Sequence, residues 1–393
     1  MFARVSSRRK VLGQIAGLGA LALSACAPVA VTTPLTDAPA LETGAPVPVA
    51  LLVPAGSPVE SDNFVARNLE NAARLAIGDL DGVEVDLRVY ATAGDPQQAA
   101  AVARTAVEEG AAIILGPLRA EEANAVGVAT AASGVNVLAF SNNPTIAGGN
   151  VFVLGPTFGN TADRLIRYGR GIGLDRYLIA HGSDLGGNLG RDAIQAAAAA
   201  SGATITGVQS YPLSQQGIQA AAPGIATAAT TSGAQAIFTT ADSTLDLPFL
   251  ASALRDGGLP AGTVRLVGLT RWDVTPEILT QPGLQDGIFA IPDASMTRAF
   301  ETRYEAAYGA TPLPVAALAY DGIAAIGALA QRGGAQALSR ASLTQGQGFQ
   351  GTAGIFRLLP DGTNQRGLAV ATVRNNQVVI LDPAPRSFAG AGS

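Results

Sequence analysis

The stretch that decides the fold is AAIILGPLRAEEANAVGVATAASGVNVLAFSNNPT, residues 111–145. Its first apolar run, residues 111–115, ends at a Gly-Pro pair, which is the pattern of a buried parallel strand that breaks into a loop. Small and apolar side chains share one face of residues 120–132, which predicts a helix, and residues 135–140 predict the next strand. Asparagine and proline then force residues 141–145 out of regular structure.

Polar side chains follow both predicted strands of this stretch. Ligands of open α/β sheets bind outside the carboxyl ends of the strands, so the residues after each strand are candidate ligand contacts. In the first half of the chain these candidates are Arg119, Ser141, Asn142, Asn143 and Thr145. Structural roles are the alternative, because Arg119 can pair with Glu122 on the following helix and asparagine can cap its own loop.

The segments before this stretch alternate between strand and helix patterns. Residues 47–54 are almost entirely apolar and predict a buried strand, and Asp62 can cap a helix that runs to about residue 79. Residues 83–89 alternate between apolar and charged side chains, which predicts a half-exposed strand. Asp95 begins a further helix, because it precedes Pro-Gln-Gln, with proline in the first turn and glutamine at the capping-box position. This order predicts a parallel sheet.

Residues 151–269 repeat the alternation and predict a second doubly wound lobe. Its strand-end candidates for ligand contact are Asp184, Asp242, Arg271 and Trp272. An aromatic ring at the mouth of a cleft can stack on a ligand, but Trp272 can also be a packed side chain at the lobe boundary. His181 ends a predicted strand, and we expect a structural role for it.

The composition excludes several classes of enzyme. Lys10 is the only lysine, Cys26 the only cysteine and His181 the only histidine. A Schiff base, a disulfide or a thiolate metal site therefore has no residues to form it, and no G-x-S-x-G elbow is present to partner His181 in a triad. Paired-carboxylate glycosidase chemistry needs only acids and stays open. We expect a protein without catalytic activity, metal or cofactor.

The chain is acidic, which argues against a nucleic-acid surface. Its formal charge is −5, and removal of the four positive charges of residues 1–25 makes it −9. Phosphate backbones and anionic membranes attract basic surfaces, so neither is an expected partner of the folded part.

Residues 1–25 have the features of a signal peptide, and the sequence around Cys26 has those of a lipidation site. Arg8 and Arg9 precede an apolar stretch too short to span a membrane, and the pair resembles a twin-arginine signal, with export by the general secretory route left open. The segment closes on Leu-Ser-Ala-Cys, which resembles a bacterial lipobox that acylates Cys26; an ordinary secretory signal with a chance cysteine is the alternative. Residues 26–46 then predict a proline-rich flexible tether.

The order of these segments resembles the type I periplasmic binding proteins of the leucine-binding family over about residues 47–383, most clearly in AAIILGPLRAEEANAVGVAT and GVNVLAFSNNPT. The resemblance implies an α/β fold of two doubly wound, Rossmann-like parallel-sheet lobes joined by a multi-strand hinge. It implies lobe one at residues 47–155 plus about 291–341, lobe two at residues 156–290 plus about 342–385, and a tail at residues 386–393.

Two functions follow from the resemblance. The lipobox, the tether and the ending FQGTAGIFRLLPDGTNQRGLAVATVRNNQ, residues 349–377, resemble penicillin-binding protein activators, which are envelope lipoproteins that stimulate peptidoglycan synthases. This resemblance implies a peptidoglycan synthase as partner and a lipid anchor in a bacterial membrane. We expect that membrane to be the outer one. The alternative is a solute-binding protein that delivers an amino acid or related small molecule to an ABC permease, supported by the fold and by residues 141–145.

Cys26→Ser is expected to release the protein from the membrane fraction, because acyl chains on Cys26 are the one membrane anchor that the sequence predicts. Fractionation of cells that express the variant, with a high-salt wash, measures this directly. A variant that still sediments with membranes after that wash would show that something other than the lipid holds it.

Overall fold

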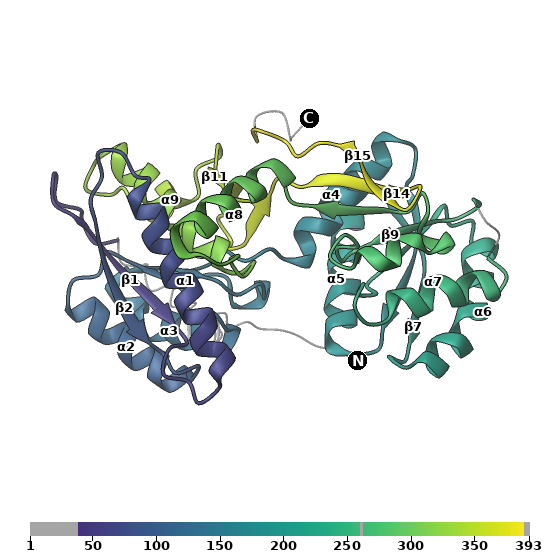
Figure 1. Ribbon diagram of the computed structural model, residues 1–393, viewed down its shortest axis with the longest axis horizontal. Helices are drawn as coiled ribbons and strands as arrows, with labels where there is room; N and C mark the ends of the chain where they lie inside the picture. Colours follow the sequence, from purple (N-terminus) through teal and green to yellow (C-terminus); the bar gives the residue numbers. More distant parts are fainter. Residues whose placement is uncertain (1–37, 260–261, 389–393) are drawn as a thin grey trace, which may run out of the picture. The chain divides into compact units, whose positions relative to one another are not determined.

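The computed structural model describes residues 38–259 and 262–388 (Figure 1). The predicted signal peptide and the predicted lipidation of Cys26 lie outside these residues. Among the helices described, none has both the length and the apolar character that a membrane span requires.

The first lobe is built on a five-stranded parallel sheet in the order β2-β1-β3-β4-β5. Its strands are β1 (Val47–Val53), β2 (Val85–Ala91), β3 (Ile113–Leu115), β4 (Asn136–Ala139) and β5 (Val151–Val153). The helices of this lobe are α1 (Glu60–Gly78), α2 (Pro96–Glu108), α3 (Ala120–Thr130), α8 (Ala294–Tyr308), α9 (Ala316–Gln331) and α10 (Arg340–Leu343). The predicted parallel sheet with crossover helices is confirmed.

Alternate residues of β1 show why helices cover both faces of this sheet. Val49 and Leu51 pack in one core with side chains of α1, α8 and α9. Ala50 and Leu52 point to the opposite face and pack with side chains of α2 and α3. Successive side chains of a strand leave opposite faces of the sheet, so an apolar strand needs a helical layer on each side.

The second lobe is built on a seven-stranded sheet in the order β15-β14-β10-β9-β8-β6-β7. Its strands are β6 (Arg176–Gly182), β7 (Thr204–Tyr211), β8 (Ala236–Thr239), β9 (Arg265–Gly268), β10 (Ile288–Ile291), β14 (Ala369–Arg374) and β15 (Gln377–Asp382). Its helices are α4 (Phe158–Gly171), α5 (Leu185–Ser201), α6 (Gln215–Thr231) and α7 (Leu247–Asp256). Strands β6 to β10 are parallel, and β14 and β15 extend the sheet antiparallel, side by side in Figure 1.

The same division into two faces holds in this lobe. Leu178 and Ala180 of β6 pack with side chains of α6 and α7. Tyr177 and Ile179 pack on the other face with side chains of α4 and α5. The predicted second doubly wound lobe is therefore present, with the two antiparallel strands as an addition at one edge.

A small third sheet lies in the return of the chain between the lobes. Its strands, in the order β11-β12-β13, are β11 (Phe349–Gly351), β12 (Gly354–Leu358) and β13 (Asn364–Arg366). Phe349, Phe356 and Leu358 belong to the core of the first lobe. Residues 342–385, expected wholly in lobe two, are thus divided: the first three strands pack on lobe one, and the chain reaches lobe two only at β14. The chain passes between the lobes after β5, after β10 and after β13.

Of the two predicted N-caps, Asp95 caps its helix and Asp62 does not. Asp95 accepts a hydrogen bond from the Gln98 amide at 2.8 Å, so the predicted N-cap of α2 is confirmed. Asp62 does not cap α1, which begins two residues earlier after Val59. Its carboxylate instead accepts hydrogen bonds from the Ser57 hydroxyl and from Arg119, and a side chain held by these partners is not free to bond the backbone amides of α1.

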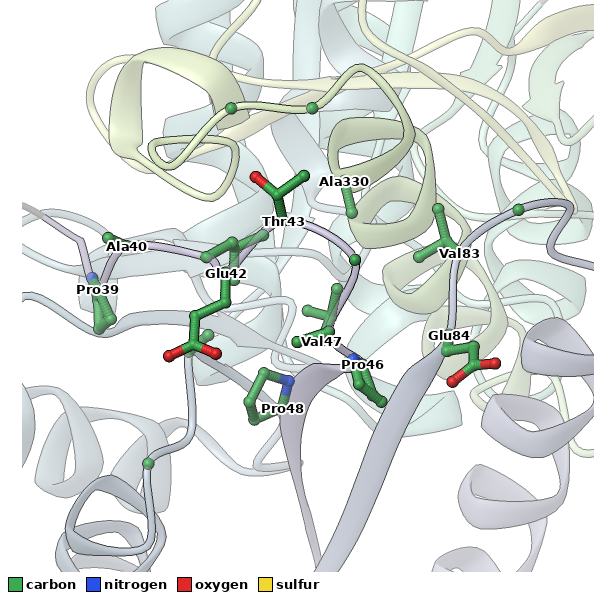
Figure 2. A pocket seen from close by; sticks show the side chains of 18 of the residues that line it. Pro39, Ala40, Glu42, Thr43, Pro46, Val47, Pro48, Val83, Glu84 and Ala330 are labelled. Atoms are coloured by element: carbon green, nitrogen blue, oxygen red, sulfur yellow. The ribbon is translucent and has the colours of Figure 1, made fainter.

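The end of the predicted tether packs on the first lobe, which corrects the expectation of a flexible segment up to residue 46. Ala38 is 7% exposed, and the Leu41 amide donates to the Ala335 carbonyl at 2.9 Å. Residues 39–48 line a cavity of about 810 Å³ together with Val83 and Ala330, as Figure 2 shows. This cavity lies where β1 to β3 begin, because Pro48, Glu84 and Ala112 also line it.

Gly322→Ala is expected to lower the free energy of unfolding by about 1–3 kcal/mol, because the added methyl group would overlap the Leu115 side chain between α9 and the sheet. Gly224→Ala is the matched control. Gly224 is an exposed glycine within α6, and a methyl group there meets nothing within 4 Å, so we expect a gain of about 0.5–1 kcal/mol. Denaturant unfolding of both variants checks the prediction; equal effects would contradict the close packing.

Candidate functional site

Two cavities of similar volume occur in the described part of the chain, and their positions distinguish them. The 810 Å³ cavity opens where the strands of lobe one begin. The other, of about 850 Å³, lies where strands end, since the residues after β3, β4, β9 and β10 line it. The three crossings between the lobes contribute too, through Pro156, Pro292 and Leu368. Ligands of parallel sheets bind at the carboxyl ends of strands, so the 850 Å³ cavity is the candidate site.

Four of the nine predicted ligand contacts line this cavity: Ser141, Asn142, Asn143 and Arg271. The loop after β4 is held by its own side chains, because the Ser141 hydroxyl accepts from the Asn143 amide at 3.1 Å. Asn143 in turn accepts from the Thr145 amide at 3.0 Å and from its hydroxyl at 2.9 Å. Thr145 does not line the cavity, and loop capping accounts for its contacts. The loop therefore presents a preformed polar surface to the cavity.

Arg119 is half-exposed, is held by buried acidic side chains beside the strand ends of lobe one, and does not line the cavity. Its Nη2 lies 2.7 Å from Asp62 Oδ1, and the Ser57 hydroxyl donates to Asp62 Oδ2 at 2.7 Å. Its Nη1 lies 3.8 Å from Glu122, which accepts a hydrogen bond from the Thr92 hydroxyl at 2.5 Å. Arg119 thus makes structural ion pairs, as the alternative predicted. Besides Glu122 its partner is Asp62, which the sequence did not indicate.

The network lowers the pKa of Asp62. The hydrogen bond from the Ser57 hydroxyl is the largest cause; burial opposes it, and the Arg119 guanidinium adds to the lowering. The charged form of Asp62 is therefore the one that the fold stabilises.

The two acids predicted in lobe two serve their own loops. Asp184 is the N-cap of α5 and accepts from the Gly186 amide at 3.2 Å and the Gly187 amide at 3.1 Å. Asp242 accepts from the Thr244 amide at 2.8 Å and from its hydroxyl at 2.5 Å. Neither acid lines the 850 Å³ cavity. Each is used at a turn, where aspartate commonly bonds nearby amides.

Trp272 and His181 lie inside lobe two. Trp272 is 0% exposed and stacks on Phe289 with 5.0 Å between ring centroids, in the core that includes α6 and α7. Its contacts are those of the packed alternative, and it has no exposed surface for a ligand. His181 is buried, and its Nδ1 lies 2.8 Å from the Gly182 carbonyl, as expected for a structural histidine.

Sequence reasoning missed the buried pair of Asp321 and Arg366, which both line the cavity. Arg366 Nη1 lies 3.5 Å from Asp321 Oδ2, and Arg366 Nη2 donates to the Leu154 carbonyl. Asp321 also accepts from the Thr352 amide at 2.6 Å and from its hydroxyl at 2.9 Å. Burial raises the pKa of Asp321, and the charge of Arg366 opposes that rise. The Tyr-Asp-Gly pattern around Asp321 was the only available signal, and nothing linked it to Arg366.

The remaining lining is mostly apolar. Phe140, Leu189, Leu318 and Ile355 contribute to it, and Arg271 stands at 44% side-chain exposure with its guanidinium 2.6 Å from Asp273. The described residues contain no group of three or more His, Cys, Asp or Glu side chains that could hold a metal ion. Such a cavity suits a small organic molecule with an apolar body and few polar groups.

Asp62→Asn is expected to lower the free energy of unfolding by about 1.5–3 kcal/mol at pH 7, the range for hydrogen bonds to charged groups. A lowered pKa means that ionised Asp62 stabilises the fold above its unfolded pKa of about 3.9, and that this contribution is lost as pH falls through the lower folded value. The difference between wild type and variant should therefore shrink below about pH 4. Denaturant unfolding from pH 3 to 8 measures it. Asp86→Asn, at an exposed ion pair with Arg88, is the control with little expected effect; an equal loss there would contradict the argument.

Solved structures with the same fold come from ABC transport systems. A putative branched-chain amino acid ABC transporter from Rhodospirillum rubrum matches with a TM-score of 0.72 and 19% identity, over 86% of this chain and 100% of that one. A branched-chain amino acid ABC transporter periplasmic ligand-binding protein from Burkholderia xenovorans matches with a TM-score of 0.64 and 20% identity, over 86% and 96%. An ABC transporter substrate-binding protein from Desulfitobacterium hafniense in complex with Leu matches with a TM-score of 0.60 and 17% identity, over 86% and 100%.

At these identities the likeness establishes the fold, and the family rests on a separate finding. A search of curated proteins finds no significant relative. The model of the periplasmic binding protein family matches residues 46–377, which is most of the chain. The two lobes, the strand-end cavity and this match together show that the chain belongs to the periplasmic binding protein family.

Proposed function

We propose that the protein is a solute-binding protein that holds a small molecule in the 850 Å³ cavity and presents it to an ABC permease. The observation that carries the proposal is the lining of that cavity, which combines strand-end loops of both sheets with all three crossings. A ligand in contact with the crossings favours one arrangement of the lobes over others, which is how such folds report occupancy. The solved structures of the same fold, one of them in complex with Leu, support this function.

We further propose that the protein binds its solute without converting it, and that it faces the periplasm from a lipid anchor in a bacterial membrane. The family is periplasmic and typically non-catalytic, and the single histidine and the lack of lysine after residue 10 fit a binding role. The anchor is the proposed lipid on Cys26. Because residues 38–46 pack where β1 to β3 begin, an anchored chain leaves the strand-end cavity on the opposite edge of that sheet.

A second candidate function is regulation of a peptidoglycan synthase, as in penicillin-binding protein activators. The observation that favours it is Arg119, which stands where amino-acid binders of the leucine-binding type tend to carry serines and is bonded to Asp62. Capture of envelope proteins on the lipid-anchored chain distinguishes the two functions: an ABC permease supports transport, and a peptidoglycan synthase supports regulation.

Ligand-induced stabilisation tests the transport proposal. A mixture of small molecules from the cell's growth medium and periplasm is expected to raise the melting temperature of the mature protein, since a ligand at about 100 times its Kd adds about 2.7 kcal/mol. Ala193→Trp should reduce or abolish the rise, because Ala193 of α5 lines the cavity and an indole there takes up space that the ligand needs.

Ala196→Trp is the control on the same helix, at an exposed position that does not line the cavity, and it should keep the rise. The proposal fails if no mixture stabilises the wild type, or if both tryptophan variants respond as the wild type does. Native mass spectrometry of the stabilised sample identifies the bound molecule.

A further inference from the structure

We propose that Arg366, with the first turn of α4, binds an acidic group of the solute, and that the solute carries no amino group. The inference rests on the proposed solute-binding function and names the chemistry of its ligand. Arg366 belongs to β13, lines the 850 Å³ cavity and is 9% exposed. Nothing in the sequence marked it as a site residue.

The guanidinium of Arg366 has fewer partners than a buried cation requires. Its Nη2 donates to the Leu154 carbonyl, its Nη1 reaches Asp321 only at 3.5 Å, and its Cζ lies 5.3 Å from the centre of the Phe356 ring. Its buried Nε has no hydrogen-bond partner among the described residues. A guanidinium carries five N–H donors, and an unsatisfied buried donor destabilises the fold unless something binds it. A carboxylate accepts two parallel hydrogen bonds from a guanidinium and would supply the missing partner.

Asp321 does not satisfy the N–H donors of Arg366 fully. One of its oxygens accepts two hydrogen bonds from Thr352, and the other is the one 3.5 Å from Arg366. At 3.5 Å the contact is at the weak end of charged hydrogen bonds. Burial raises the pKa of Asp321 and lowers that of Arg366, so each of the two charges depends on the other as its partner. The pair has no net charge, but its long contact leaves N–H donors of Arg366 unsatisfied beside the cavity.

The amino terminus of α4 adds positive potential to the same cavity. Thr157, Phe158 and Gly159 line it, and they form the N-cap and first two residues of this 14-residue helix. The first amides of a helix have no partner within the helix and carry a partial positive charge. The first turn contains no acidic side chain that would offset that charge. Anions bind readily at such termini.

The charged lining explains why an amino group is not expected. Among the described residues that line the cavity, the charged ones are Arg271, Asp321 and Arg366. Asp321 is 0% exposed and lies beside the Arg366 cation, which repels a second cation, so a ligand ammonium would be buried without an accessible carboxylate to pair with, which is costly. The apolar part of the lining, which includes Phe140, Leu318 and Ile355, suits a branched or aromatic hydrocarbon body. The ligand class is a small carboxylic acid of that kind.

Three probes with the same 3-methylbutyl chain separate the two charged groups: 4-methylpentanoate has the acid alone, leucine has both groups, and 3-methylbutylamine has the amine alone. Calorimetric titration of the mature protein should give tighter binding of 4-methylpentanoate than of leucine, and no binding of the amine. Benzoate, with an aromatic body, should bind as an acid also.

The double variant Asp321→Asn with Arg366→Gln removes both charges of the pair and leaves polar side chains at both positions. We expect it to weaken 4-methylpentanoate binding about 10- to 100-fold, the range for a charge-assisted hydrogen bond. Arg164→Gln is the control, because Arg164 also holds a crossing, through the Leu368 carbonyl and Asp382, without lining the cavity. It should bind the acid as the wild type does. Melting curves confirm that each variant is folded.

The outcomes separate this inference from the proposed function. Equal loss in Arg164→Gln would show that Arg366 acts only by holding the crossings, and unchanged affinity in the double variant would exclude it from the site; either overturns the inference. Binding of the amine but not the acids, or stabilisation by the solute mixture without binding of either acid, overturns the inference and leaves the solute-binding function standing. Failure of the mixture and the acids together counts against both.

Discussion

The structure depends on one constraint, which is that the central parallel strands of both lobes are buried on both faces. In β1 and in β6, alternate side chains enter two separate cores, and a different set of helices closes each core. Such sheets expose polar backbone only at the ends of the strands and in the loops that follow. The position of the candidate site follows from this constraint, because the 850 Å³ cavity is lined where β3, β4, β9 and β10 end.

Strand β13 lines the cavity through Arg366 and also holds the first crossing between the lobes. Asn364 donates to the Val153 and Gly155 carbonyls at 2.8 Å each, and it accepts from the Asn160 side chain at 2.9 Å. Arg366 donates to Leu154 between them. The last crossing thus holds the first one by hydrogen bonds to its backbone, at a place where that backbone has left the sheet. A ligand that contacts β13 contacts the segment that ties the crossings together.

Arg119 and Arg366 show how partners decide what an arginine can do. Arg119 is bound to Asp62 at 2.7 Å and lies 3.8 Å from Glu122, although its Nη1 has no hydrogen-bond partner among the described residues. Its charge is used within the protein. Arg366 has a longer contact to its acid and an unpartnered Nε, and it lines the cavity. Each has one buried nitrogen without a partner, so what distinguishes the two is the distance to the acid and the place beside the cavity.

The sequence by itself determined the two wound lobes, the parallel sheets, the N-cap at Asp95 and the polar loop after β4, because each follows from local periodicity or local capping chemistry. It did not determine which polar side chains meet. Asp62 and Arg119 are 57 positions apart and Asp321 and Arg366 are 45, and only the packing of their elements joins them. The sequence shows that Trp272 follows a strand, which made it a candidate for the cleft. Its burial against Phe289 is a long-range contact in the core of lobe two, which the sequence does not show. Local patterns specify elements, whereas a site is a set of long-range contacts that exists only once the lobes have packed.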